Sequence, residues 1–192
     1  MIWQYQRAIR YAQQRLPRCL WDVGGLTIAL TLTLIIHQDL ISIDRGINLA
    51  RDGTNFSAEH ALIRNAFREF GSFPSWNYHY MAGMPFHASP QTAAFYFTAI
   101  LDWLAPNELL SMRFGVVLSI VASSLGGYFM ARTWGANQLG ALLAAILMGG
   151  GGAQLGRLWA GHVSFLLAAP YYPFALSFIH IAICRRSFIA MF

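Results

Sequence analysis

The sequence predicts an all-α integral membrane protein with about four transmembrane helices and a structured loop on the outer face of the membrane. Three observations predict this class: 56% of the residues are hydrophobic, only 11% are charged, and the apolar residues fall into separate long stretches. Soluble domains carry roughly 25% charged residues. A soluble core could not bury this much apolar surface, so the lipid bilayer is the expected partner.

The polar residues exclude several other classes of function. All thirteen basic residues are arginine, which excludes chemistry that needs a lysine amine, such as a Schiff base or a P-loop. The arginines lie singly or in pairs beside apolar segments, so the net charge of +5 indicates membrane topology and no nucleic-acid partner. Cys19 and Cys184 have neither CxxC nor zinc spacing, so we expect packing roles for both and no metal site.

The N-terminal part predicts a membrane anchor. Residues 1–19 carry four arginines and form a predicted cytoplasmic tail, and residues 20–41 are apolar and long enough to span a bilayer. This stretch is too long for the core of a signal peptide, and no A-x-A cleavage site follows it. The anchor is therefore expected to be uncleaved, and residues 42–91 are expected to form an outer loop.

Within this loop, residues 57–71 predict an amphipathic helix that lies on the membrane. Ser57 is a suitable N-cap and Gly71 a suitable stop, and apolar residues recur between them at intervals of three and four. Residues 73–91 are interrupted by proline and glycine, which predicts irregular structure.

The C-terminal part predicts further spans. Residues 92–105 are too few to cross a bilayer easily and include Asp102, so this segment either crosses or enters the membrane and returns. Residues 109–184 hold three segments of spanning length, and residues 185–192 form a short tail. The three predicted spans are residues 109–131, 139–156 and 163–184.

The arginines favour four spans over five. With four spans, Arg132, Arg185 and Arg186 join the N-terminal arginines in the cytoplasm, and only Arg157 lies in a short outer connection. With five spans, this distribution is reversed for the C-terminal part. We therefore expect a multi-pass protein of the inner (cytoplasmic) membrane with both termini in the cytoplasm.

Four short motifs follow one another in the loop and after it. They are Gly71-Ser72-Phe73-Pro74-Ser75-Trp76-Asn77, Met81-Ala82-Gly83-Met84-Pro85-Phe86, Ala88-Ser89-Pro90-Gln91 and Phe95-Tyr96-Phe97. Their order and spacing resemble the outer loop of YfhO-type membrane proteins, in the GT-C superfamily of polyprenyl-phosphate-sugar-dependent glycosyltransferases. Residues 131–135 and 161–162 are similar to the same family. Its members usually have many more spans, so the chain looks like a truncated N-terminal part that is too short to be active alone.

The resemblance implies a set of site residues. An acid in the first outer loop of the family acts as a general base or holds a divalent metal, and Asp52 matches its position best. The metal would be Mg or Mn if the chain is an enzyme. Trp76, Asn77 and Gln91 of the matching motifs are expected to contact the substrate. Tyr78-His79-Tyr80 replaces a segment in which proline is common, which weakens the catalytic hypothesis. A solvated loop carboxylate paired with an arginine is the alternative for Asp52.

Other residues carry two interpretations each. Arg113 could bind the phosphates of a polyprenyl-phosphate lipid, or its side chain could reach the membrane surface. The run Gly149–Gly152 either interrupts a span or lets two helices approach closely, and we favour close packing. His79 and His87 lack acidic neighbours and are expected to be structural.

Two classes of function, and a third alternative, follow. The first is a non-catalytic GT-C-like subunit that docks to other membrane subunits of a larger complex, through residues 139–184 and through Trp76, Tyr78 and Tyr80 of the loop. We expect partner helices because polar groups at membrane depth need hydrogen bonds. The second is a glycosyltransferase that uses Asp52. The third is a haem- or pigment-associated subunit, which the intramembrane histidines suggest, although hydrogen bonds to neighbouring helices are their default role. The polar groups meant here are Arg113, Tyr171, Tyr172 and His180, and the histidines are His37, His162 and His180.

Overall fold

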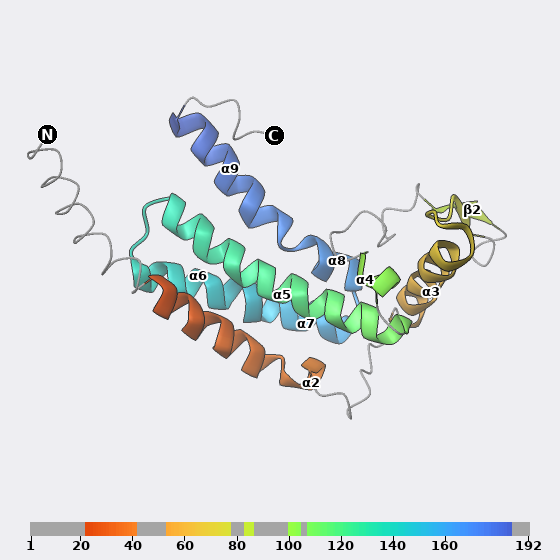
Figure 1. Ribbon diagram of the computed structural model, residues 1–192. Coiled ribbons are helices and arrows are strands. Elements are labelled where there is room, and N and C mark those ends of the chain that lie inside the picture. The colour runs from red at the N-terminus through yellow and green to blue at the C-terminus, as the bar shows by residue number, and fades with distance from the viewer. Residues whose placement is uncertain (1–21, 42–52, 78–82, 87–99, 105–106, 186–192) are drawn as a thin grey trace, which may run out of the picture.

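The structure, a computed structural model, describes residues 22–41, 53–77, 83–86, 100–104 and 107–185. These residues are mostly helical, with one pair of short strands (Figure 1). In chain order the elements are a first helix (Asp22–Ile36), α2 (Gln38–Ile41), α3 (Gly53–Phe70), β1 (Trp76–Asn77), β2 (Met84–Pro85), α4 (Ile100–Leu104), α5 (Glu108–Thr133), α6 (Gln138–Gly150), α7 (Gly152–Ala160), α8 (Val163–Ala168) and α9 (Tyr171–Arg185).

Three helical segments are long and apolar enough to cross a membrane. They are Leu109–Thr133, Gln138–Ala160 and Val163–Cys184. The first helix, Asp22–Ile36, is also apolar but shorter, and a turn at His37 separates it from α2. The prediction of a mostly helical chain with three long apolar helices at these positions is therefore confirmed. Of the short segment 92–105, the structure describes only α4, so its path lies outside the described residues.

The first helix and α5 run antiparallel. At one end, the Tyr128 hydroxyl donates to Asp22 Oδ1 at 2.6 Å, and Arg132 Nε lies 3.2 Å from the same oxygen. At the other end, Leu40 joins a buried cluster with Met112 from the first turns of α5. We call these the Asp22 end and the α3 end of the bundle. The chain therefore enters and leaves the segment between the two helices at the α3 end.

Glycines allow α5 to contact two neighbouring helices closely. A Cβ on Gly127 would lie 2.7 Å from the backbone oxygen of Ala144, so α5 and α6 are nearly in backbone contact. A Cβ on Gly126 would lie 2.7 Å from Pro173 Cγ, on the side that faces α9. A short turn joins α5 to α6, and Asn137 caps α6 by accepting from the Gly140 N–H at 2.9 Å. These contacts make α5 the central helix of the bundle.

The first helix packs onto α5 and α6 at Gly149. A Cβ there would lie 2.8 Å from Ser124 Cβ and 2.9 Å from Thr33 Cγ2. The Ile36 side chain packs against the adjacent Gly150 in the same way, because a Cβ on Gly150 would lie 2.8 Å from Ile36 Cδ1. Close helix packing is therefore confirmed at Gly149 and Gly150 of the four-glycine run. Small residues allow such close contacts between helices.

Two of the predicted spans are interrupted. The segment expected at 139–156 is broken at Gly151 into α6 and α7 and continues to Ala160. The segment 163–184 is broken at Ala169 and Pro170 into α8 and α9, because a proline cannot donate to the preceding turn. The glycine run thus both interrupts the helix and packs closely, which the sequence presented as alternatives.

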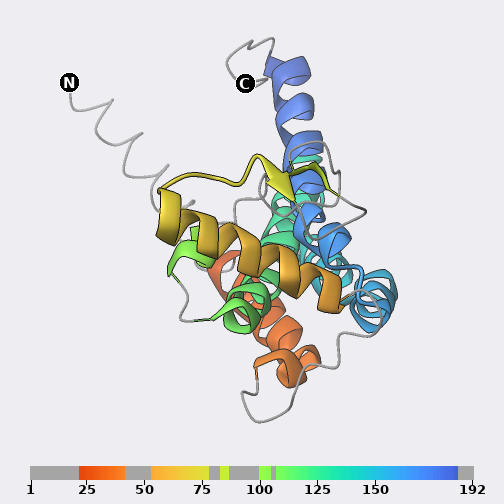
Figure 2. The same ribbon diagram turned by 90° about the vertical axis from the view of Figure 1, so that its right-hand side faces the viewer.

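Helix α3 lies across the α3 end of the bundle, as Figure 2 shows. It begins at Gly53, four residues before the predicted cap at Ser57, and ends at Phe70. Gly71 follows with a φ of 65°, a left-handed conformation that confirms the predicted stop. The region expected to be irregular contains an antiparallel pair, in which Trp76 faces Pro85 and Asn77 faces Met84.

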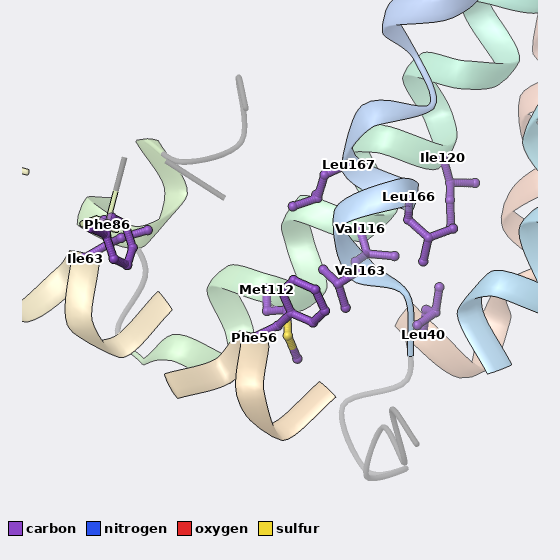
Figure 3. Close-up of a cluster of buried hydrophobic side chains, with 10 residues drawn as sticks. All are labelled: Leu40, Phe56, Ile63, Phe86, Met112, Val116, Ile120, Val163, Leu166 and Leu167. Atoms are coloured by element: carbon purple, nitrogen blue, oxygen red, sulfur yellow. The ribbon is translucent and has the colours of Figure 1, made fainter. Parts of the chain in front are cut away.

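The apolar core has two parts. The larger lies at the α3 end and joins α3, α5, α8 and the residue that follows β2 (Figure 3). The smaller lies nearer the Asp22 end and joins the first helix, α5 and α6 through Ala29, Tyr128, Ala141 and Ala145. The larger part fixes the position of α3 relative to the helices of spanning length.

The contact at Gly149 is testable with two glycines of the same run. We expect Gly149→Ala to destabilise the protein by about 1–3 kcal/mol, because its methyl group would overlap Ser124 and Thr33. Gly152→Ala is the matched control, since nothing lies within 4 Å of a Cβ there. Thermal unfolding in detergent would measure both variants. Equal midpoints for the two would contradict the close packing of the first helix.

Candidate functional site at the α3 end

The candidate site is built on the buried face of α3. Phe56, His60 and Ile63 recur at intervals of four and three, so they share one side of the helix, and all three are buried. Figure 3 shows Phe56 beside Met112 and Val163, and Ile63 beside Phe86. The apolar face that the sequence assigned to the membrane surface therefore packs largely on the protein itself.

The β1–β2 hairpin is attached to α3 through Phe86. The Phe86 N–H donates to the Ser75 carbonyl at 2.9 Å, which extends the strand pair by one bond and turns the ring towards Ile63. Gly83 has a φ of 105°, and a Cβ there would lie 2.6 Å from Trp76 Nε1. Only glycine adopts this positive φ readily and also leaves room for the indole, so the Trp76 ring lies directly over the Gly83 backbone.

Polar side chains accompany this apolar contact. His60, Asn77 and Arg113 are buried, and Glu59 and Arg64 are half-buried. Within the described residues, Glu59 Oε2 is buried without a hydrogen-bond partner. Loss of water raises the pKa of Glu59 to about 7, and the neighbouring His60 opposes this rise. A carboxyl with this pKa can exchange a proton near neutral pH, the property of a general acid or base.

The structure locates three of the five predicted site residues. Arg113 lies near the start of α5 and is only 5% exposed, so the chain itself encloses its guanidinium. Trp76 and Asn77 form β1, with the indole 40% exposed and the Asn77 side chain buried. Asp52 and Gln91 lie outside the described residues. Arg113 and the hairpin both belong to the α3 end, where α3 packs against α5 and Phe86 packs against α3.

Sequence reasoning missed Glu59 and His60 as candidate site residues. A signal was available, because both fall between Phe56 and Ile63 at the spacing of one helical face. That spacing places polar side chains at or beside the buried surface. It was overlooked because the helix was expected to begin at Ser57, which left Phe56 out of the apolar pattern.

A metal or haem site would need several suitable side chains to lie close together in the described residues. No cluster of three or more His, Cys, Asp or Glu side chains occurs among them. His180 lies beside Trp134 at the Asp22 end, with 5.7 Å between the ring centres, whereas His162 lies at the turn between α7 and α8. His37 binds the carbonyl of Gly149. The three histidines are therefore spread over different parts of the bundle.

Comparison with known proteins adds no assignment. No family model, no curated protein and no solved structure matches the chain.

The protonation of Glu59 predicts a pH dependence. The folded-state pKa of about 7 lies above the ordinary value of 4.5, so the folded chain favours the neutral carboxyl. This contribution to stability is fully present below about pH 4.5 and is lost as the pH rises through about 7. We expect the thermal midpoint to fall over this range in the wild type and to fall less in Glu59→Gln.

Glu69→Gln is the matched control, because Glu69 is exposed on the same helix. It should keep the pH dependence of the wild type. An unchanged slope in Glu59→Gln would contradict the assigned burial of this carboxyl.

Proposed function

We propose that the chain crosses the inner (cytoplasmic) membrane four times, with the Asp22 end in the cytoplasm. The antiparallel first helix and α5 support this arrangement, because the segment between them then begins and ends on the outer side. Residues 92–105 would make no net crossing. Arg132 lies beside Asp22 at the proposed cytoplasmic end, in agreement with the positive-inside rule. Both termini would face the cytoplasm, and α3 would lie on the outer face.

Two exposed tryptophans support the same placement. Trp134 caps the end of α5 and is 56% exposed, and Trp159 lies near the end of α7 and is 83% exposed. The 23-residue segment Gln138–Ala160 begins beside the first and ends at the second, and its length of about 35 Å suits a bilayer core of about 30 Å. Tryptophan favours the two membrane interfaces, so each would mark one of them.

We further propose that the chain is a non-catalytic membrane subunit, GT-C-like as its loop motifs suggest, that docks to other membrane subunits. The observation that carries this proposal is the exposure of Tyr172. Its side chain is 61% exposed, yet it lies about 14 Å along the helix from Val163, near the middle of the 22-residue segment. Lipid chains offer no hydrogen-bond partner at this depth, whereas a neighbouring protein helix can supply an acceptor for the hydroxyl.

Helix α9 offers a continuous surface around Tyr172. Exposed apolar side chains follow it at helical spacing, and α9 packs mainly against α5, at the edge of the bundle (Figure 1). A transmembrane helix of a partner subunit could lie along this side. The residues of this α9 stripe are Tyr172, Leu176, Ile179 and Ile183.

The glycosyltransferase hypothesis stands second. The outer loop would bind a polyprenyl-phosphate sugar, and a carboxyl would act as the base. Glu59 favours keeping this alternative, because its pKa of about 7 suits proton transfer and it lies in the loop that carries the motifs. Asp52, which immediately precedes α3 in the chain, is the other candidate. The burial of Arg113 weakens its proposed role as a phosphate ligand.

Site-directed photo-crosslinking in native membranes tests the docking proposal. A photoreactive amino acid at position 172 should cross-link to a second membrane protein. The same amino acid at position 35 is the control, because Ile35 is 56% exposed on the first helix, outside the proposed surface. Tyr172→Phe, which removes only the hydroxyl, should lower recovery of the same partner on purification.

Equal cross-linking at positions 172 and 35 would contradict the proposed surface. Recovery of a stable monomer that transfers sugar from a polyprenyl-phosphate donor would favour the transferase. In that event Asp52→Asn and Glu59→Gln would identify the base, since loss of an acid or base lowers turnover by roughly a hundredfold to ten-thousandfold.

A further inference from the structure

At the interruption between α6 and α7, two backbone carbonyls accept hydrogen bonds from side chains and not from the next turn of helix. In an unbroken helix the Met148 and Gly149 carbonyls would accept from the N–H groups of the residues four positions ahead. Here Gln154 Nε2 donates to the Met148 carbonyl at 3.2 Å, and His37 Nε2 donates to the Gly149 carbonyl at 2.9 Å. The turn after the first helix and α7 therefore each supply a hydrogen bond to the last carbonyls of α6.

These two bonds leave one acceptor on each side chain. Because His37 Nε2 donates to a carbonyl, Nδ1 of the neutral ring carries a lone pair. The Gln154 amide oxygen Oε1 is bonded to the same carbon as the nitrogen that reaches Met148. Both side chains are more than nine-tenths buried, and among the described residues neither His37 Nδ1 nor Gln154 Oε1 has a hydrogen-bond partner.

The start of α7 supplies donors at the same place. The residue that caps α7 is Gly151, which has no side chain to accept from the first N–H groups of the helix. In an unbroken helix the N–H groups of Gly152 and Ala153 would donate to the Met148 and Gly149 carbonyls, which here accept from Gln154 and His37 instead. Among the described residues, neither N–H donates to another backbone carbonyl outside the helices. Gly152 and Ala153 are exposed, and nothing lies within 4 Å of a Cβ built on Gly152, so no side chain covers the start of α7.

We propose that this interruption is an intramembrane water-binding site, with His37 Nδ1 and Gln154 Oε1 as acceptors and the Gly152 and Ala153 N–H groups as donors. Water is the small molecule that both donates and accepts hydrogen bonds, and buried water typically makes two to four of them. Hydrocarbon can satisfy neither kind of group, and irregular backbone at membrane depth occurs where it lines protein or water.

The site gives His37 a chemical role beyond packing. Its Nε2 donates to the Gly149 carbonyl, so Nδ1 is the ring atom that remains to accept a hydrogen bond from water. This inference does not depend on the docking proposal.

Cysteine accessibility tests the site, in a background with Cys19→Ser and Cys184→Ser. A153C should react with a small water-soluble methanethiosulfonate reagent at least about tenfold faster than L147C, because only a hydrated thiol ionises to the reactive thiolate. Leu147 lies on α6, before the break, and is 67% exposed, so it is the matched lipid-facing control. Equal and slow reaction of A153C and L147C would overturn the proposal.

Removing the acceptors tests the named residues. H37L and Q154L should each lower the reaction rate of A153C, while I35L, at an exposed position of the first helix, should leave it unchanged. Each variant is first checked for a monodisperse peak in detergent. Q154L leaves the first helix intact, so it reports on the site even where H37L fails to fold. An unchanged A153C rate in Q154L would remove Gln154 from the site.

Discussion

The approach of the first helix to α5 and α6 at Gly149 is the constraint on which the rest of the structure depends. The hydroxyl oxygens of Thr33 and Ser124 lie 3.4 Å apart at this contact. A side chain at position 149 would overlap both residues, so only glycine fits there. The contact fixes the first helix antiparallel to α5, and the ion pair between Asp22 and Arg132 holds the same alignment at one end. Together with the contact between Ile36 and Gly150, the Gly149 contact places His37 against the break between α6 and α7.

The α3 end follows from this alignment. Because the first helix and α5 are antiparallel, the C-terminal end of one and the start of the other lie together, and Leu40 and Met112 share a cluster with Phe56 of α3. Helix α3 can then lie across the bundle and bring Glu59 and His60 to a surface with little water. The same packing that stabilises α3 therefore raises the pKa of Glu59, so the chemistry of this site is a consequence of where the helix docks.

The sequence predicted the elements better than it predicted their contacts. Apolar length placed the three long apolar helices within a few residues, and Gly71 ended α3 as expected, because both signals are local. The start of α3 and the strand pair were missed, since Phe56 and Phe86 are defined by contact with distant residues. The glycine run shows what the sequence could not decide. It was compatible with close packing or with interruption of the helix, and the structure has both. Of the predicted site, Arg113, Trp76 and Asn77 are located, but no local pattern could show that Arg113 is enclosed or that Glu59 is half-buried.

The central claim is the antiparallel alignment, and cysteine cross-linking in native membranes tests it most directly. A Cβ on Gly25 would lie 3.1 Å from Gln138 Nε2, at the end opposite Asn107, the residue that caps α5. With both native cysteines replaced by serine, the pair Gly25→Cys and Gln138→Cys should cross-link with a short reagent. The pair Gly25→Cys and Asn107→Cys should not. Cross-linking of the second pair in place of the first would contradict the alignment and restore the five-span model.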